Sequence, residues 1–161
     1  MRGTGAIVGT KAPDFSLKNQ FGERFQLSEH LQNGPTVLAF YPGDFTLVCT
    51  KQLCNYRDNW DTFKDLGIQI VGVSGNTEDD HGRFTKRYDF KFPLLSDPGK
   101  KVARLYGCTS VLMFGAVSRA VAIINRQGVL LYRYVEPTAL THQNAGELLK
   151  IIQDLRDNKL M

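Results

Sequence analysis

Short runs of apolar residues punctuate this chain and have the length of buried strands. The runs at 37–41 and 68–74 are mostly apolar, as expected for strands that are covered on both faces of a parallel sheet. Pro42 and Gly43 end the first run, because both residues interrupt regular structure. A shorter strand is expected within 91–97, so the pattern predicts three central strands.

Two further pairs of strands are expected to form antiparallel hairpins. Polar and apolar residues alternate over 15–17 and 24–27 with turn residues between them, which predicts a small N-terminal hairpin. Apolar stretches at 119–125 and 129–135 flank the short segment Arg-Gln-Gly, and this tight loop predicts a second hairpin near the end of the chain.

Helical periodicity fills the intervals between these strands. Residues spaced by three or four positions mark one face of a long helix from about Leu47 to near Gly67: Leu53, Tyr56, Trp60 and Phe63. Ser28 is a candidate cap for a short helical turn through Leu31. The other helices are expected over 77–88 with Thr77 as a candidate cap, over 99–106, and from Thr141 or Asn144 to about 158.

The order of these elements predicts the fold class. A βαβ unit that is followed by a hairpin and a final helix gives a mixed sheet with helices on both faces. A chain of 161 residues suits one domain, 1–161, with a sizeable core. We therefore predict an α/β protein with an N-terminal β-hairpin added to a mixed central sheet.

Composition narrows the class of protein. Hydrophobic residues make up 42% and charged residues 22% of the chain, as in ordinary globular proteins. The net charge of +4 comes without a long Lys/Arg run, so no nucleic-acid partner is expected. No apolar run reaches 18 residues, so no membrane-spanning segment and no membrane partner are expected, and residues 1–9 lack the pattern of a secretory signal. Three cysteines do not fit a secreted disulfide scaffold and favour a reducing cytoplasm.

Cys49 is the strongest candidate for chemistry. It lies in the first turn of the predicted long helix, directly after a buried strand. Unpaired backbone N–H groups and the helix dipole favour an anion there, and a thiolate is an anion and a nucleophile. The simpler interpretation is a small buried hydrophobic residue. A second cysteine, Cys54, five residues later, favours reactive chemistry.

Pro42, Thr46 and Cys49 form P-x-x-x-T-x-x-C, which resembles the active-site signature of the peroxiredoxins, the thiol peroxidases. Thr50 and Cys54 extend the resemblance to the Q-type subfamily, the bacterioferritin comigratory proteins. It covers about residues 9 to 155 and includes further matching fragments: Ala12-Pro13-Asp14-Phe15, the segment 92–97, and Arg119 at the head of a late strand. The resemblance implies a thioredoxin-like fold with an N-terminal hairpin extension.

The resemblance also implies a role for each matched residue. Cys49 is the peroxidatic cysteine, Cys54 is the resolving cysteine, and Pro42 shields the thiolate and shapes the pocket. Thr46 can hydrogen-bond the sulfur or the peroxide, although it is equally suited to cap the helix. Arg119 corresponds to the family's active-site arginine. The alternative is a side chain that simply reaches solvent, as most arginines at strand ends do.

The implied reaction is reduction of hydrogen peroxide and organic hydroperoxides. A sulfenic acid on Cys49 condenses with Cys54 to an intramolecular disulfide, which thioredoxin or a glutaredoxin reduces. The resemblance implies no cofactor or metal. No Val-Cys-Pro motif follows Val135, so the C-terminal resolving cysteine of the typical two-cysteine class is absent. Resolution within one chain is therefore expected, and the resemblance then favours a monomer. Gln52 replaces a common glutamate, and Cys108 matches no catalytic position.

Two other classes remain as alternatives. A general disulfide oxidoreductase of the thioredoxin type usually needs C-x-x-C, whereas the spacing here is C-x-x-x-x-C. A redox-switched zinc-binding holdase would draw its ligands from the three cysteines and three histidines, although their spacings match no standard zinc pattern: Cys49, Cys54, Cys108, His30, His81 and His142.

Overall fold

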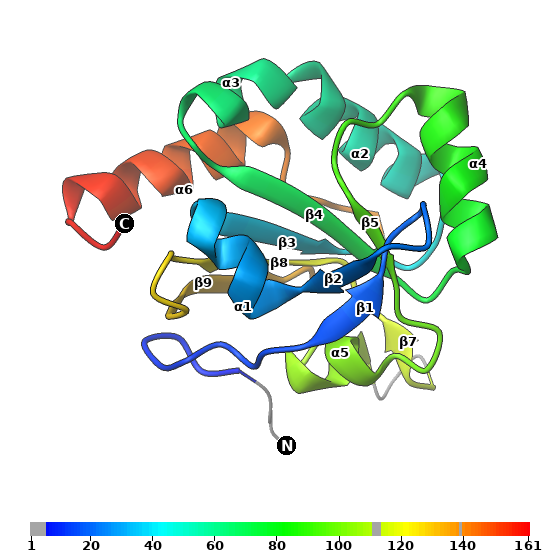
Figure 1. The fold of residues 1–161 in the computed structure, drawn as a ribbon, viewed down its shortest axis with the longest axis horizontal. Helices are drawn as coiled ribbons and strands as arrows, with labels where there is room; N and C mark the ends of the chain where they lie inside the picture. Colours follow the sequence, from blue (N-terminus) through cyan, green and yellow to red (C-terminus); the bar gives the residue numbers. More distant parts are fainter. Residues whose placement is uncertain (1–5, 111–113, 139) are drawn as a thin grey trace.

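A mixed sheet runs through the centre of the protein (Figure 1). The computed structural model describes residues 6–110, 114–138 and 140–161, so the first part of the segment 1–9 lies outside it. Within the described residues the strand order is β2-β1-β5-β4-β3-β8-β9. The strands are β1 Ser16–Lys18, β2 Arg24–Gln26, β3 Thr36–Phe40, β4 Gln69–Ser74, β5 Leu94–Ser96, β8 Ala120–Ile124 and β9 Leu130–Val135.

Strand directions follow the order of elements in the sequence. Strands β3, β4 and β5 are parallel, and the connections between them contain helices. Both predicted hairpins are confirmed, since β1 pairs antiparallel with β2 and β8 pairs antiparallel with β9. Strand β8 also pairs antiparallel with β3, so the sheet is mixed, as predicted.

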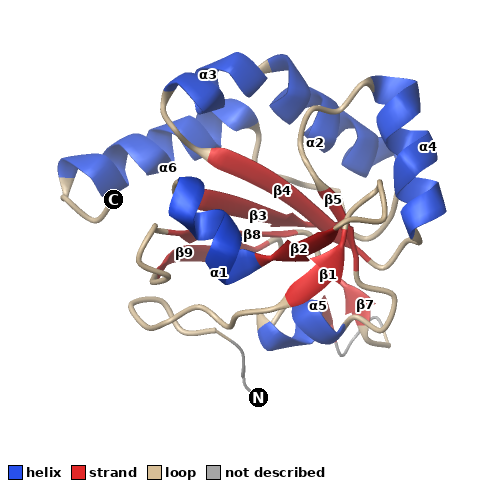
Figure 2. Cartoon of the chain, viewed as in Figure 1, coloured by secondary structure: helices blue, strands red, loops and turns tan. Residues whose placement is uncertain are grey.

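Helices cover both faces of this sheet (Figure 2). One face carries α2 (Leu47–Asp58), α3 (Trp60–Asp65), α4 (Glu78–Tyr88) and α6 (Ala145–Asp157). The other face carries α1 (Leu27–His30), η1 (Leu31–Asn33) and α5 (Lys101–Leu105). This arrangement confirms the predicted α/β class with a thioredoxin-like sheet and an N-terminal hairpin.

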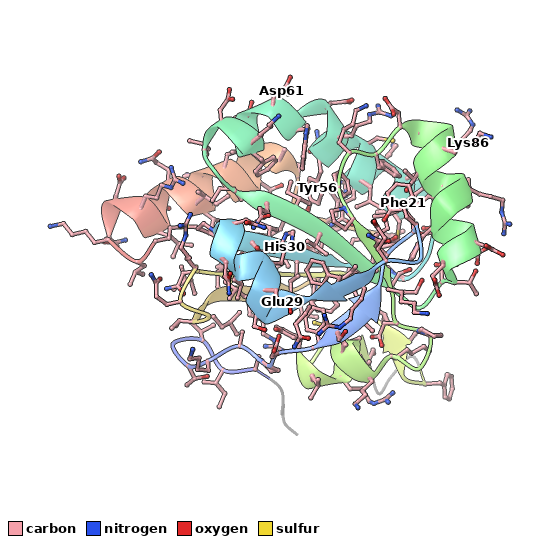
Figure 3. The ribbon with its side chains drawn as sticks, in the orientation of Figure 1. Phe21, Glu29, His30, Tyr56, Asp61 and Lys86 are labelled. Carbon is pink, nitrogen blue, oxygen red and sulfur yellow. The ribbon has the colours of Figure 1, made fainter. Side chains whose placement is uncertain are left out.

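Two apolar cores lie on opposite faces of the sheet. Successive residues of β3 alternate between them, so Val37 and Ala39 pack beneath α2 and α6 while Leu38 and Phe40 pack toward α1 and α5. Tyr56 of α2 is fully buried, whereas Asp61 on α3 and Lys86 on α4 point away from the sheet (Figure 3).

The structure corrects the predicted long helix. It is broken at Asn59 into α2 and α3. Asn59 Nδ2 donates to the carbonyl oxygen of Asn55 at 2.8 Å, and its backbone leaves the helical region at φ −106° and ψ 14°. Asparagine side chains compete with the helical hydrogen-bond ladder in this way, and the apolar periodicity continued across the break and concealed it.

Three smaller differences concern element ends and short strands. Ser28 does not cap α1, because its backbone N–H donates to Asp14 Oδ1 inside a helix that already begins at Leu27. Asn144, not Thr141, caps α6 and forms a capping box with Glu147.

The sequence did not predict the two-stranded pair β6 (Thr109–Ser110) and β7 (Ala116–Val117). The predicted cap Thr77 is confirmed, since it accepts from Asp80 N.

The described residues contain no helix with both the length and the apolar character needed to cross a membrane.

Candidate active site

Cys49 occupies the third position of α2, which the loop 41–46 connects to the carboxyl end of β3. Thr46 is the residue before the helix, and the thiol of Cys49 is fully buried. The first-turn N–H groups of a helix have no intrahelical partner, so this end of α2 favours a negative charge on the sulfur. The sequence-based placement of Cys49 in the first helical turn is therefore confirmed.

Arg119 lies directly beside this sulfur. The antiparallel register of β3 and β8 pairs Phe40 with Ala120, so Arg119 stands at the edge of the sheet where α2 begins. Its Nη2 donates to Cys49 Sγ at 2.9 Å, and Arg119 is only 4% exposed. Its Nη1 donates to the carbonyl oxygen of Thr141 at 3.4 Å. This arginine therefore does not simply reach solvent, and its charge faces the thiol.

The other two signature residues line the loop that precedes α2. Pro42 is exposed and follows Tyr41, whose N–H makes the last bond of the strand to Val73 O at 3.0 Å. Thr46 is exposed, and its Oγ1 donates to Gly43 O at 3.0 Å without capping the helix through its side chain. Thr46 thus stands at the N-cap position, with its hydroxyl turned back into the loop.

Cys54 lies on the same continuous helix as Cys49, and both thiols are free. Cys54 is half-buried at the margin of the core beneath α2. Burial raises the pKa of its thiol, and the positive charge of Arg57 opposes part of that shift. In the intact helix Cys54 is therefore a weak nucleophile at neutral pH.

The polar residues behind α2 join it to the segment that precedes α6. Gln52 is fully buried, and its Nε2 donates to Tyr56 Oη at 3.0 Å. Tyr56 Oη in turn donates to Gln143 O at 2.6 Å, and Asn55 Oδ1 accepts from Ala145 N at 2.6 Å. These bonds fix the second half of α2, beyond Cys54.

Cys108 lies on the other side of the sheet. It belongs to the core that packs toward α1 and α5, whereas Cys49 belongs to the core beneath α2. Its thiol donates to Tyr106 O at 3.4 Å, and burial raises its pKa to about 12. The structure therefore does not bring Cys108 together with Cys49.

The described residues contain no group of three or more His, Cys, Asp or Glu side chains that could hold a metal ion. His81 uses both ring nitrogens within the protein, toward Asp44 and toward Leu95 O. The six residues considered for zinc thus do not converge.

Sequence reasoning missed a buried cluster behind the loop that leads to Cys49. Three residues meet there: Tyr41 directly after β3, Asp44 of the following loop and His81 of α4. The available signal was the histidine on the same face of the predicted helix as Phe84 and Tyr88, but nothing in the sequence pairs it with Asp44.

Comparisons with known proteins agree on one family. The model described as the AhpC/TSA family matches residues 8–133. The chloroplastic peroxiredoxin Q of Triticum aestivum is 39% identical over 147 residues, which cover 91% of this chain and 67% of the relative. The chloroplastic peroxiredoxin Q of Sedum lineare is 36% identical over 148 residues, which cover 92% of this chain and 78% of the relative.

Two solved peroxiredoxin structures are also similar to this chain. Peroxidoxin BcpB from Mycobacterium tuberculosis superposes with a TM-score of 0.82 at 30% identity and covers 94% of this chain and 97% of its own. The reduced 2-Cys peroxiredoxin of Plasmodium vivax has a TM-score of 0.85 at 23% identity, covering 94% of this chain and 83% of its own, and shows the shared fold.

Proposed function

This chain belongs to the AhpC/TSA family and is similar to the Q-type peroxiredoxins, and from that membership we propose that Cys49 is the sulfur that attacks the peroxide. The family assignment makes the protein a thiol-dependent peroxidase, an oxidoreductase. The observation that carries the residue assignment is the 2.9 Å contact from Arg119 Nη2 to Cys49 Sγ at a helix N-terminus.

The first step is displacement at oxygen. The thiolate of Cys49 attacks one oxygen of the peroxide, the S–O bond forms as the O–O bond breaks, and the departing oxygen takes up a proton and leaves as water or an alcohol. Arg119 stabilises the thiolate and hydrogen-bonds the reacting oxygens as negative charge moves onto them. Thr46 supplies a hydroxyl at the same loop, and Pro42 limits access of water to the sulfur.

The second step removes the sulfenic acid. The thiol of Cys54 attacks the sulfur of Cys49, the S–O bond breaks, and water leaves as an intramolecular disulfide forms. A dithiol protein of the thioredoxin or glutaredoxin class then reduces this disulfide by thiol–disulfide exchange and is itself oxidised. A monomer acting in the cytoplasm is part of the same proposal.

Peroxide consumption by single-cysteine variants tests the assignment. Cys49→Ser is expected to abolish consumption, because serine cannot be oxidised to a sulfenic acid. Cys108→Ser is the matched control and is expected to keep full turnover, since that thiol lies on the other face of the sheet. Near-normal activity of Cys49→Ser contradicts the proposal.

The rival activity is separated by its substrate. A general disulfide oxidoreductase reduces insulin disulfides and does not need Arg119. We expect this protein to reduce insulin disulfides slowly and to consume hydrogen peroxide fast. The opposite ratio would favour the oxidoreductase.

A further inference from the structure

A buried hydrogen-bonded cluster stands behind the loop that leads to Cys49. It consists of Tyr41, Asp44 and His81, and the side chains of Asp44 and His81 are 1% and 0% exposed. Asp44 lies in the loop between β3 and α2, midway between Pro42 and Thr46. The reaction proposed above uses none of these three residues.

The positions of the hydrogens follow from the contacts. His81 Nε2 lies 3.0 Å from the carbonyl oxygen of Leu95, which can only accept, so Nε2 carries a hydrogen. His81 Nδ1 lies 2.6 Å from Asp44 Oδ2, and a contact this short between them requires one shared proton. Tyr41 Oη donates to the other carboxyl oxygen, Asp44 Oδ1, at 2.7 Å.

The pair is therefore neutral as a whole. With the shared proton on nitrogen it is an imidazolium and a carboxylate, and with the proton on oxygen it is two uncharged groups. In both cases the pair adds no net negative charge to the cluster, whose third member, Tyr41, interacts electrostatically with Cys49. An unpaired carboxylate at this place would oppose a thiolate, because like charges repel strongly where water is excluded.

The same cluster fixes the backbone of the loop. Asp44 N donates to Asn76 Oδ1 at 2.8 Å, which ties the loop to the residues just before α4. Phe45 then adopts a positive φ of 63°, a left-handed conformation that a bulky residue holds only when its surroundings impose it. Its ring packs on Phe84 of α4, with the ring centroids 4.9 Å apart. Thr46 and α2 follow directly.

We propose that Asp44 and His81 form a positioning pair for the peroxide-attacking cysteine. Their hydrogen bond holds the loop against α4 so that Cys49, in the first turn of α2, faces Arg119, and their shared proton keeps the charge of Asp44 from opposing the thiolate. This proposal rests on the assignment of Cys49 as the attacking sulfur. Neither residue touches the peroxide.

The other titratable and charged groups around the pair come from four elements. They are Tyr41 directly after β3, Cys49 in α2, Asp80 of α4 through its bond with Asn76, and Arg119 directly before β8 through its bond with Cys49. Burial, reinforced by Asp44, raises the pKa of Tyr41 well above its ordinary value, so Tyr41 stays a donor. Replacing His81 changes the charge of the cluster without removing any of these groups.

Asp44→Asn tests whether the reaction needs the hydrogen bonds of the pair or the carboxylate itself. In Asp44→Asn the new amide can donate to His81 Nδ1 and accept from Tyr41, so both the loop and the neutral charge are kept. We expect its second-order rate with hydrogen peroxide to stay within about threefold of the parent. Asp44→Ala removes the link and is expected to lower that rate at least tenfold. Equal rates for the two variants overturn the positioning role.

The charge role is tested through His81. In a background carrying Cys54→Ser and Cys108→Ser, the rate of iodoacetamide alkylation against pH reports the thiolate of Cys49 alone. His81→Leu leaves Asp44 unpaired, so we expect the midpoint of this profile to rise by at least one pH unit. Adding Asp44→Asn to His81→Leu is expected to return the midpoint most of the way. An unchanged midpoint in His81→Leu overturns the charge role.

Thr77→Ala is the matched control for loss of stability. It removes the side-chain cap of α4 and leaves the loop contacts in place. We expect it to lower the melting temperature without moving the midpoint or the peroxide rate, and an equal loss of rate would overturn the pair's specific role. Should Cys49→Ser stay active, the assignment of the attacking sulfur fails, whereas parent-like alkylation and rates in His81→Leu defeat only the pair.

Discussion

Arg119 Nη2 donates to Cys49 Sγ at 2.9 Å, although 70 residues separate the two in the sequence. The antiparallel pairing of β3 with β8 produces this contact, because it sets the residue before β8 beside the start of α2. The sulfur thus receives a hydrogen bond from a full positive charge in a buried site.

Replacing Arg119 tests what that contact does. Arg119→Ala removes both the charge and the donor, and we expect the rate with hydrogen peroxide to fall about 10²–10³-fold, as for the loss of one transition-state donor. The midpoint of Cys49 alkylation should move to higher pH. Arg126→Ala, on the exposed hairpin loop, is the control and should leave both unchanged. Parent-like kinetics in Arg119→Ala would rule the role out.

The Cys49–Cys54 disulfide requires α2 to open. Residues five apart on an α-helix have Cα atoms about 8–9 Å apart and point about 140° away from each other. A disulfide needs Cα atoms within about 7 Å. We therefore expect oxidation to remove amide protection from about Leu47 to Cys54, as measured by hydrogen exchange. A disulfide within an unchanged helix contradicts this prediction.

Opening should stop at Tyr56, which is anchored to Gln143. Tyr56→Phe removes that anchor, leaves two buried polar groups without a partner, and is expected to cost about 1–3 kcal/mol of stability. In the oxidised variant the loss of amide protection should extend beyond residue 56. Tyr134→Phe, at a more exposed position, is the control. If the loss of amide protection ends at the same residue in Tyr56→Phe and in Tyr134→Phe, the bond from Tyr56 to Gln143 does not set the boundary of opening.

Cys108 should be inert toward alkylation in the native protein. Its pKa is raised to about 12 by burial, so the reactive thiolate is scarce at pH 7 to 9 and increases only as pH approaches 12. Peptide mapping after treatment with iodoacetamide at pH 8 should find Cys108 unmodified in the folded protein and modified in urea. Rapid native modification would show that the site is open.

The sequence predicted the elements whose signals are local. Apolar runs located β3, β4 and β8, and the start of α2 followed from the end of β3, so Cys49 was placed in the first turn. The break at Asn59 was not predicted, because the apolar face of α2 continues into α3. The β6–β7 pair was missed because each strand has only two residues, too few to show alternation.

The contacts of the site were less predictable than its elements. The place of Arg119 opposite Cys49 came from a family resemblance, since its register against β3 is a property of the folded sheet. Asp44 and His81 lie 37 residues apart, and each is unremarkable in its local sequence. The two residues meet because α4 packs beside the loop, and a local sequence pattern does not predict that packing.

Mass spectrometry after one equivalent of hydrogen peroxide tests the central claim most directly. Peptides from the wild-type protein should contain a disulfide that joins Cys49 to Cys54, with Cys108 still a thiol. In Cys54→Ser, dimedone should trap a sulfenic acid on Cys49 alone. A disulfide that includes Cys108, or a sulfenic acid on Cys54 while Cys49 stays reduced, would contradict the account.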